Sequence, residues 1–162
     1  MINSKSPNLL PQEQLTLAHL HEQAEMRRYR QLALRLLPTA PDISRLMVAL
    51  GIECEQRLEV LNAVAEKLGF AACLGEKESK TATPLAPSRR HFFVVNGHMA
   101  GDVLDEAVEA AHHSWHFFDA LLATNATPEL YRPLHAFVQQ KHAEWQVLEE
   151  RRQEWHLEAR LP

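Results

Sequence analysis

The residues of this sequence best suited to chemistry are carboxylates that interrupt an apolar stripe. Glu22 and Glu25 continue the three-four spacing of one helix face whose other members are mostly apolar. Because an isolated buried charge is costly, a carboxylate on such a stripe has to be paired, protonated or bound to a metal. We therefore expect Glu22 and Glu25 to belong to a metal site or to a polar network.

Histidines in the second half of the chain form another group of candidate ligands. Glu109 and His112 make an E-x-x-H pattern, and His112 and His116 are one helical turn apart. Their periodicity places all three with Asp102 and Asp105 on the face opposite the apolar stripe. This favours a solvated surface, and a metal bound there would lie at the exterior or in an oligomer interface.

Four long helices are expected to position these side chains, separated by Pro-rich and Gly-rich segments. Their predicted ranges are 11–37, 42–68, 98–123 and 128–157. The short links join antiparallel neighbours, and the long connection 69–97 is expected to cross the bundle from end to end. Within it, the segment HFFVV (91–95) is a candidate for a brief extended piece. The fold class is all-α: two antiparallel hairpins joined by a crossover, in one domain over 1–162.

The apolar stripes give each helix an expected inward face. In 42–68 the stripe is interrupted by Arg57, and Gly69 is the expected left-handed C-cap. Thr127 is the expected N-cap of 128–157. The inward residues of 11–37 are Leu15, Ala18, Glu22, Glu25, Tyr29, Leu32 and Leu36. Those of 98–123 are Met99, Val103, Ala107, Ala110, Ser114, Phe117 and Leu121, and those of 128–157 are Leu134, Val138, Trp145 and Leu148.

Composition excludes several classes of function. A formal net charge of −4 provides no basic field for nucleic acid. No stretch reaches the roughly 18 apolar residues of a membrane span, and the N-terminal residues lack the order of a secretory signal, so we expect a cytoplasmic protein. Cys54 and Cys73 stand alone, without a C-x-x-C pair, which argues against a disulfide framework and against a thiolate metal site.

The order of helices and some local sequences resemble the rubrerythrin branch of the ferritin-like superfamily. The segment HEQAEMRRYRQLA is similar to the family signature in which Glu22 is a metal ligand and Tyr29 its aromatic neighbour. In IECEQRLEVLNAVAEKLG, Glu55 aligns with a ligand glutamate, and Leu58 stands where the family has histidine. The resemblance covers about residues 12–150.

The other two helices also depart from the family's ligand pattern. EAAHHSWHFFDALLA places Ala111 where a bridging glutamate is expected. FVQQKHAEWQVLEE keeps the family histidine as His142 but has Gln139 in place of the glutamate. The resemblance therefore implies a degenerate di-metal site.

One function implied by the resemblance is binding of iron, manganese or zinc. The ligands would be Glu22, Glu55 and His142, assisted by Gln139 and Glu25, and the chemistry would be oxidative or peroxide-related. Two carboxylates and one histidine suit a mononuclear site better than a di-metal centre. Ferritin-like relatives also imply a homodimer. The small-molecule substrate is not indicated.

The alternative is a metal-free bundle. Arg57 would then replace the positive charge of a metal, and Glu22, Glu25 and Glu55 would be neutralised by arginine and by His142. Such a bundle would work as a dimeric interaction module or as a small-ligand-binding module. The substitutions at Leu58, Ala111 and Gln139 favour this reading.

Overall fold

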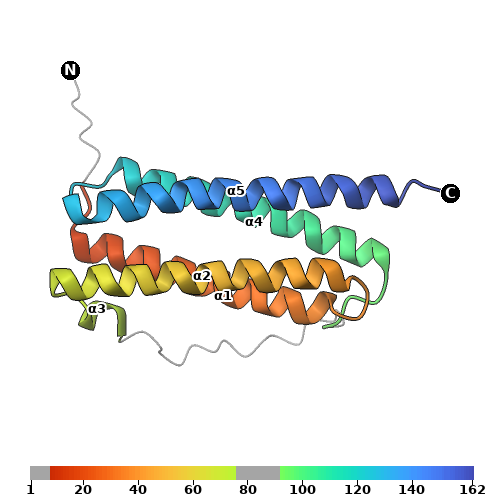
Figure 1. Ribbon diagram of the computed structural model, residues 1–162, viewed down its shortest axis with the longest axis horizontal. Helices are drawn as coiled ribbons and strands as arrows, with labels where there is room; N and C mark the ends of the chain where they lie inside the picture. The colour runs from red at the N-terminus through yellow and green to blue at the C-terminus, as the bar shows by residue number, and fades with distance from the viewer. Residues whose placement is uncertain (1–7, 76–91) are drawn as a thin grey trace, which may run out of the picture.

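The computed structural model describes residues 8–75 and 92–162, and this part of the chain is helical with no strand. Its helices are four long ones and one of a single turn, arranged as in Figure 1. Their bounds are α1 Pro11–Leu36, α2 Pro41–Leu68, α3 Ala72–Gly75, α4 Gly97–Ala123 and α5 Pro128–Glu158. The four predicted long helices are thus confirmed to within one residue at each end, and α3 was not predicted.

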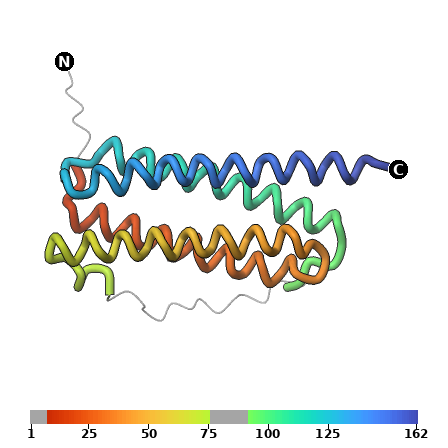
Figure 2. Tube along the Cα trace, viewed as in Figure 1, coloured from red at the N-terminus to blue at the C-terminus, as the bar shows by residue number. Residues whose placement is uncertain are grey.

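The long helices form two antiparallel hairpins, α1 with α2 and α4 with α5. The hairpins meet through α1 against α4 and through α2 against α5. Figure 2 shows that α2 and α4 run in the same direction, so the chain enters α4 at the end of the bundle opposite the end of α2. Most of the predicted crossover 69–97 lies in residues 76–91, outside the described ranges.

Local interactions explain where the helices begin and end. Gly69 has φ +77° and its N–H donates to carbonyls of the last turn of α2, which confirms the predicted C-cap. The side chain of Asn96 caps α4 by accepting from the Met99 N–H at 2.9 Å. Thr127 is confirmed as the N-cap residue of α5, but its side chain makes no cap bond. Asn125 Oδ1 accepts from the Thr127 N–H.

The predicted extended segment is not a strand within its described part, Phe92–Val95. It still attaches to the first hairpin. The buried Val94 donates its N–H to the Arg35 carbonyl at 2.9 Å and accepts from the Thr39 hydroxyl at 2.6 Å. These two bonds fix the start of α4 against the link between α1 and α2.

The inward face of α1 is as predicted, and the faces of α4 and α5 are partly so. Val103, Ala107, Ser114 and Leu121 of α4 and Leu134 and Leu148 of α5 are buried as expected. Met99, Ala110 and Phe117 are only partly buried. The buried residues of α4 include Ala100, Leu104, Ala107, Ala111, Ser114, Phe118 and Leu121. Those of α5 are Leu130, Leu134, Phe137, Lys141, Glu144 and Leu148. Each buried face also includes neighbouring residues that the predicted stripe left out, because apolar periodicity alone does not fix which of two adjacent stripes is buried.

The apolar core is divided into two clusters. One contains Tyr29, Met47, Leu50, Leu104 and Leu148 and the other contains Leu15, Leu61, Phe118, Leu134 and Phe137, each with further members. Charged residues occupy the middle of the bundle between them. No helix in the described ranges is long and apolar enough to cross a membrane.

Candidate functional site

Four charged side chains are fully enclosed in the middle of the bundle. They are Glu22 from α1, Arg57 from α2, and Lys141 and Glu144 from α5, and none is more than 2% exposed. Buried charges are tolerated only when each is matched by opposite charge and hydrogen bonds. We call Glu22, Arg57, Lys141 and Glu144, together with Tyr29, the central network.

Arg57 joins the two carboxylates of this network. Its Nε donates to Glu22 Oε2 and its Nη2 donates to Glu144 Oε2, both at 3.0 Å. Nη2 also lies 3.4 Å from Cys54 Sγ, and burial raises the pKa of that thiol to about 12. The guanidinium therefore bridges α1 and α5 from its position on α2.

Lys141 supplies the second positive charge. Its Nζ lies 2.6 Å from Glu22 Oε1 and 3.8 Å from Glu144 Oε2. The shorter contact lacks the angles of a good hydrogen bond, so we treat it as an ion pair. Nζ also lies 5.7 Å from the centroid of the Phe118 ring, a cation–π distance. Two cations and two carboxylates thus balance within the core.

Tyr29 provides a further hydrogen bond to Glu144. Its hydroxyl donates to Glu144 Oε1 at 2.5 Å, while Oε2 accepts from Arg57. Burial and the nearby Glu144 charge raise the pKa of Tyr29 well above its ordinary value. Tyr29 therefore acts as a permanent hydrogen-bond donor.

The electrostatics keep Glu22 and Arg57 in their charged forms. Burial favours the protonated form of Glu22, but the charges of Lys141 and Arg57 outweigh it, and the pKa of Glu22 is lowered. Burial opposes the charge of Arg57, yet Glu22 and Glu144 raise its pKa. Neither Glu22 nor Tyr29 exchanges a proton near neutral pH, so these groups suit structural pairing more than acid–base catalysis.

The five residues predicted as metal ligands have different partners. Glu22 lies in the central network. Glu25 pairs with Arg28, at 2.5 Å, and Glu55 pairs with Arg30 at the surface. His142 packs against aromatic rings, with its centroid 4.4 Å from that of Trp115, and Gln139 is exposed. Within 8–75 and 92–162, no three His, Cys, Asp or Glu side chains converge as metal ligands.

Arg57 is buried, as the metal-free alternative expected, whereas the burial of Lys141 and Glu144 was not predicted. The spacing of residues in α5 does contain a signal for both. Continuing from Leu134 at the three-four spacing gives Phe137, Lys141, Glu144 and Leu148, the stripe that α5 buries. The predicted stripe contained Val138 and Trp145 instead, and it therefore left Lys141 and Glu144 outside the expected core.

A polar pair lies beside the network, between α1 and α4. His21 contacts the fully buried Ser114 hydroxyl at 2.8 Å, and its ring stacks on Phe117 with a centroid distance of 4.1 Å. Burial lowers the pKa of His21 despite the opposing influence of Glu25. His21 therefore favours its neutral form in the folded protein.

A groove of about 590 Å³ opens between α2 and α5 onto one side of the network. Its apolar walls include Leu46, Val60, Phe137 and Val147, and Arg57 and Glu144 lie at its floor. Val60 and Val147 are 41% and 43% exposed. The remaining nitrogen of Arg57, Nη1, reaches Gln140 Oε1 at 3.3 Å and Glu53 at 3.9 Å, two residues that also line the groove.

Comparison with known protein families, with curated proteins and with solved structures finds no match to this chain.

Proposed function

We propose that this chain is a metal-independent bundle of ferritin-like arrangement that binds a small, uncharged amphipathic molecule in the groove between α2 and α5. The observation that carries the proposal is the position of Arg57. Its guanidinium bridges the two core carboxylates, which it neutralises together with Lys141, and its Nη1 reaches two polar residues that line the groove. One residue thus substitutes for a metal charge and offers a donor to a ligand.

The arrangement of the helices supports the ferritin-like part of the proposal. The order is two hairpins with α2 and α4 in the same direction, as that architecture requires (Figure 1). Leu58 and Ala111, which stand where the family has ligands, are both buried, at 9% and 1% exposure. Apolar side chains thus occupy inward positions where a di-metal protein needs donors.

The groove supports binding of a small molecule. Its volume lies within the range of about 300–1,000 Å³ that is common for ligand sites, and apolar walls with a few polar groups are typical of them. The ligand should carry a hydrogen-bond acceptor for Arg57 Nη1. It should be uncharged, because the network is already neutral and Glu53 places a negative charge at the rim.

Iron, manganese or zinc binding with oxidative or peroxide-related chemistry remains the competing proposal. It requires Glu22 to leave both Arg57 and Lys141 and to converge with Glu55 and His142, whose present partners differ. The homodimer likewise stays a prediction.

Acetanilide, an uncharged aromatic amide, is a suitable first probe of the groove. We expect it to shift the methyl NMR signals of Val60 and Val147 and the side-chain amide of Gln140. Ala143→Trp, which fills the groove from an exposed position, should abolish the shifts, and Ala24→Trp, exposed on α1, should not. Absence of shifts with acetanilide and with aliphatic N-alkylamides, or shifts that survive Ala143→Trp, would refute the ligand site.

Metal independence has its own test. The test uses the double variant His112→Ala/His116→Ala, in which a pair of surface histidines can no longer bind metal. After incubation with iron, manganese or zinc, this variant should retain close to no metal, and its melting temperature should be equal with and without chelator. Close to one or two metals per chain, lost in Glu22→Ala, would establish the core metal site instead.

A further inference from the structure

A pair of histidines on the outer face of α4 is separate from the central network and from the α2–α5 groove. His112 and His116 are one helical turn apart, and their Nε2 atoms lie 3.1 Å from each other. Both side chains are exposed. We propose that His112 and His116 chelate one divalent transition-metal cation at the surface of the α4–α5 hairpin.

The spacing of the two nitrogen atoms fits a shared metal. Imidazole nitrogen binds zinc at about 2.0–2.1 Å, so two such ligands on one ion are about 2.9–3.4 Å apart in octahedral or tetrahedral geometry. The observed 3.1 Å lies in that interval. In the absence of metal this contact is a hydrogen bond, for which one Nε2 carries the proton and the other accepts it. For both Nε2 atoms to bind a cation, the ring that carries this proton takes its other neutral tautomer, with the proton on Nδ1, and the cation lies to one side of the line joining the two nitrogens.

Aromatic packing holds the two rings in this orientation. The His116 ring stacks on Trp115, with centroids 4.8 Å apart and planes at 27°. The His112 ring lies edge-on to Trp115 at 5.8 Å and tilted against Trp145 at 5.5 Å. Rings fixed by packing lose less freedom on metal binding, which raises affinity over that of two mobile surface histidines.

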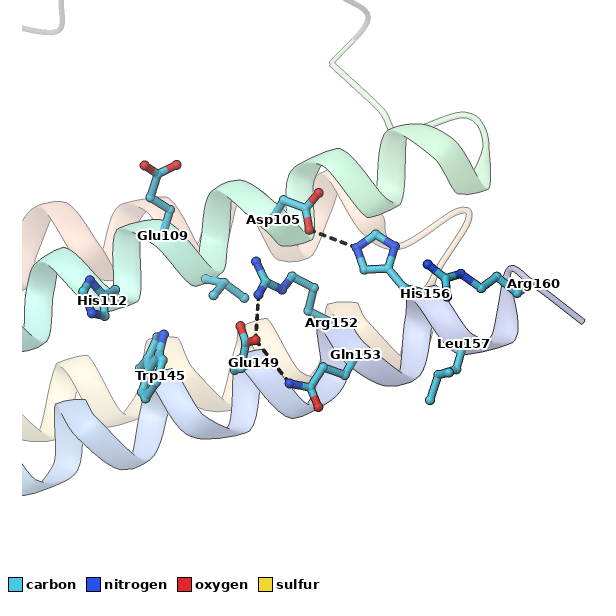
Figure 3. Close-up of a pocket in the computed structure, with 11 residues that line it drawn as sticks. Asp105, Glu109, His112, Trp145, Glu149, Arg152, Gln153, His156, Leu157 and Arg160 are labelled. Atoms are coloured by element: carbon cyan, nitrogen blue, oxygen red, sulfur yellow. Dashed lines mark hydrogen bonds and ion pairs between the residues drawn. The ribbon is translucent and has the colours of Figure 1, made fainter.

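The neighbouring groove between α4 and α5 determines which further side chains could bind the cation. Figure 3 shows His112 at the end of this groove, beside Trp145. Glu109 also lines the groove, but its carboxylate is directed away from His112. Two other groove carboxylates already have partners: Glu149 contacts Arg152 at 2.6 Å and Asp105 contacts His156 at 3.2 Å. The protein therefore supplies two nitrogen ligands and leaves the other positions to water or to an external ligand.

This ligand set selects the class of cation. Imidazole nitrogen suits Cu²⁺, Ni²⁺ and Zn²⁺, whereas Mg²⁺ and Ca²⁺ prefer oxygen ligands. With only two protein ligands, the bound ion would exchange readily and keep open positions. The inference does not depend on the proposed ligand groove, because no residue is shared.

Titration of the tag-free 162-residue chain with Ni²⁺ and Cu²⁺ tests the site. Calorimetry should give close to one site per chain, and Cu²⁺ should quench tryptophan fluorescence, because Trp115 and Trp145 contact the histidines. His112→Ala and His116→Ala should each weaken Ni²⁺ binding at least tenfold. Mg²⁺ should produce no signal.

His113→Ala is the matched control, since His113 is exposed on the same helix and lies next to the pair in sequence. It should bind Ni²⁺ as the wild type does. All three variants change exposed residues, and unchanged far-ultraviolet circular dichroism verifies that each is folded. Wild-type affinity in His112→Ala or His116→Ala, or an equal loss in all three variants, would overturn the proposal in favour of adventitious binding to surface histidines.

Discussion

The hydroxyl of Tyr29 donates a hydrogen bond of 2.5 Å to Oε1 of Glu144, across 115 positions of sequence. It links α1 to α5, and so joins one helical hairpin to the other at the middle of the core. The acceptor is an ionised carboxylate, and hydrogen bonds to buried charged groups contribute more than neutral ones.

Removing this hydroxyl should lower stability measurably. We expect Tyr29→Phe to reduce the free energy of unfolding by about 1.5–3 kcal/mol, because Glu144 keeps its burial and loses a donor. Chemical denaturation followed by circular dichroism measures this. Tyr131→Phe, on an exposed side chain, should change stability by no more than about 0.5 kcal/mol. Equal effects of the two substitutions would contradict the assigned role of Tyr29.

Arg57→Met should have a larger effect. The substitution keeps much of the apolar stem but leaves two buried carboxylates, Glu22 and Glu144, with Lys141 as their remaining cation. Loss of one partner from a buried ionic group costs about 3–5 kcal/mol.

The matched control for Arg57→Met is Arg30→Met, which removes a surface ion pair with Glu55. It should cost less than about 1 kcal/mol, because solvent screens exposed charges. Denaturation of both variants in the same buffer compares them. A loss below about 1 kcal/mol for Arg57→Met would mean that the network contributes little to the fold.

His21 should make stability depend on mild acidity. Burial lowers its pKa in the folded state, with Glu25 and Glu22 opposing this shift and Lys141 and Arg28 supporting it. The unfolded chain therefore binds the proton more readily, and the stabilising contribution is complete above the unfolded pKa of about 6.5 and lost as the pH falls from there through the folded pKa.

His21→Gln tests that dependence, because the amide does not titrate and still offers a partner to Ser114. The decrease in melting temperature between pH 7.5 and pH 5.5 should be smaller in this variant than in the wild type. His135→Gln, at an exposed position, should leave the decrease unchanged. An identical pH profile for His21→Gln would exclude His21 as the responsible group.

The end of α2 depends on a conformation that most residues avoid. Gly69 has φ +77°, and no atom lies within 4 Å of the position a Cβ would take, so the cost of a side chain is one of backbone strain alone. Gly69→Ala should cost about 1–2 kcal/mol. Gly69→Asn should cost less, since asparagine tolerates this region better. Thermal unfolding compares the two, and an alanine variant as stable as the wild type would contradict the assigned strain.

The sequence allowed the helices to be predicted more reliably than the core site. Helix ends were readable because Gly69 and the prolines at positions 41 and 128 act locally. The inward face of α1 was also readable, because it has a single stripe. In α5, two adjacent stripes have helical spacing, one with Val138 and Trp145 and one with Lys141 and Glu144. The second is the one that is buried. The charges that stabilise these residues lie on α1 and α2, so only the tertiary arrangement identifies the pairing.

The charge balance of the core constrains how the sequence can change over time. Glu22, Arg57, Lys141 and Glu144 come from three helices, yet each charge is tolerated only because the others are present. A single apolar replacement is deleterious, whereas joint replacement of a cation and a carboxylate restores neutrality. Positions 22, 57, 141 and 144 should therefore covary in descendants of this chain, and the order in which they mutate should be restricted by epistasis.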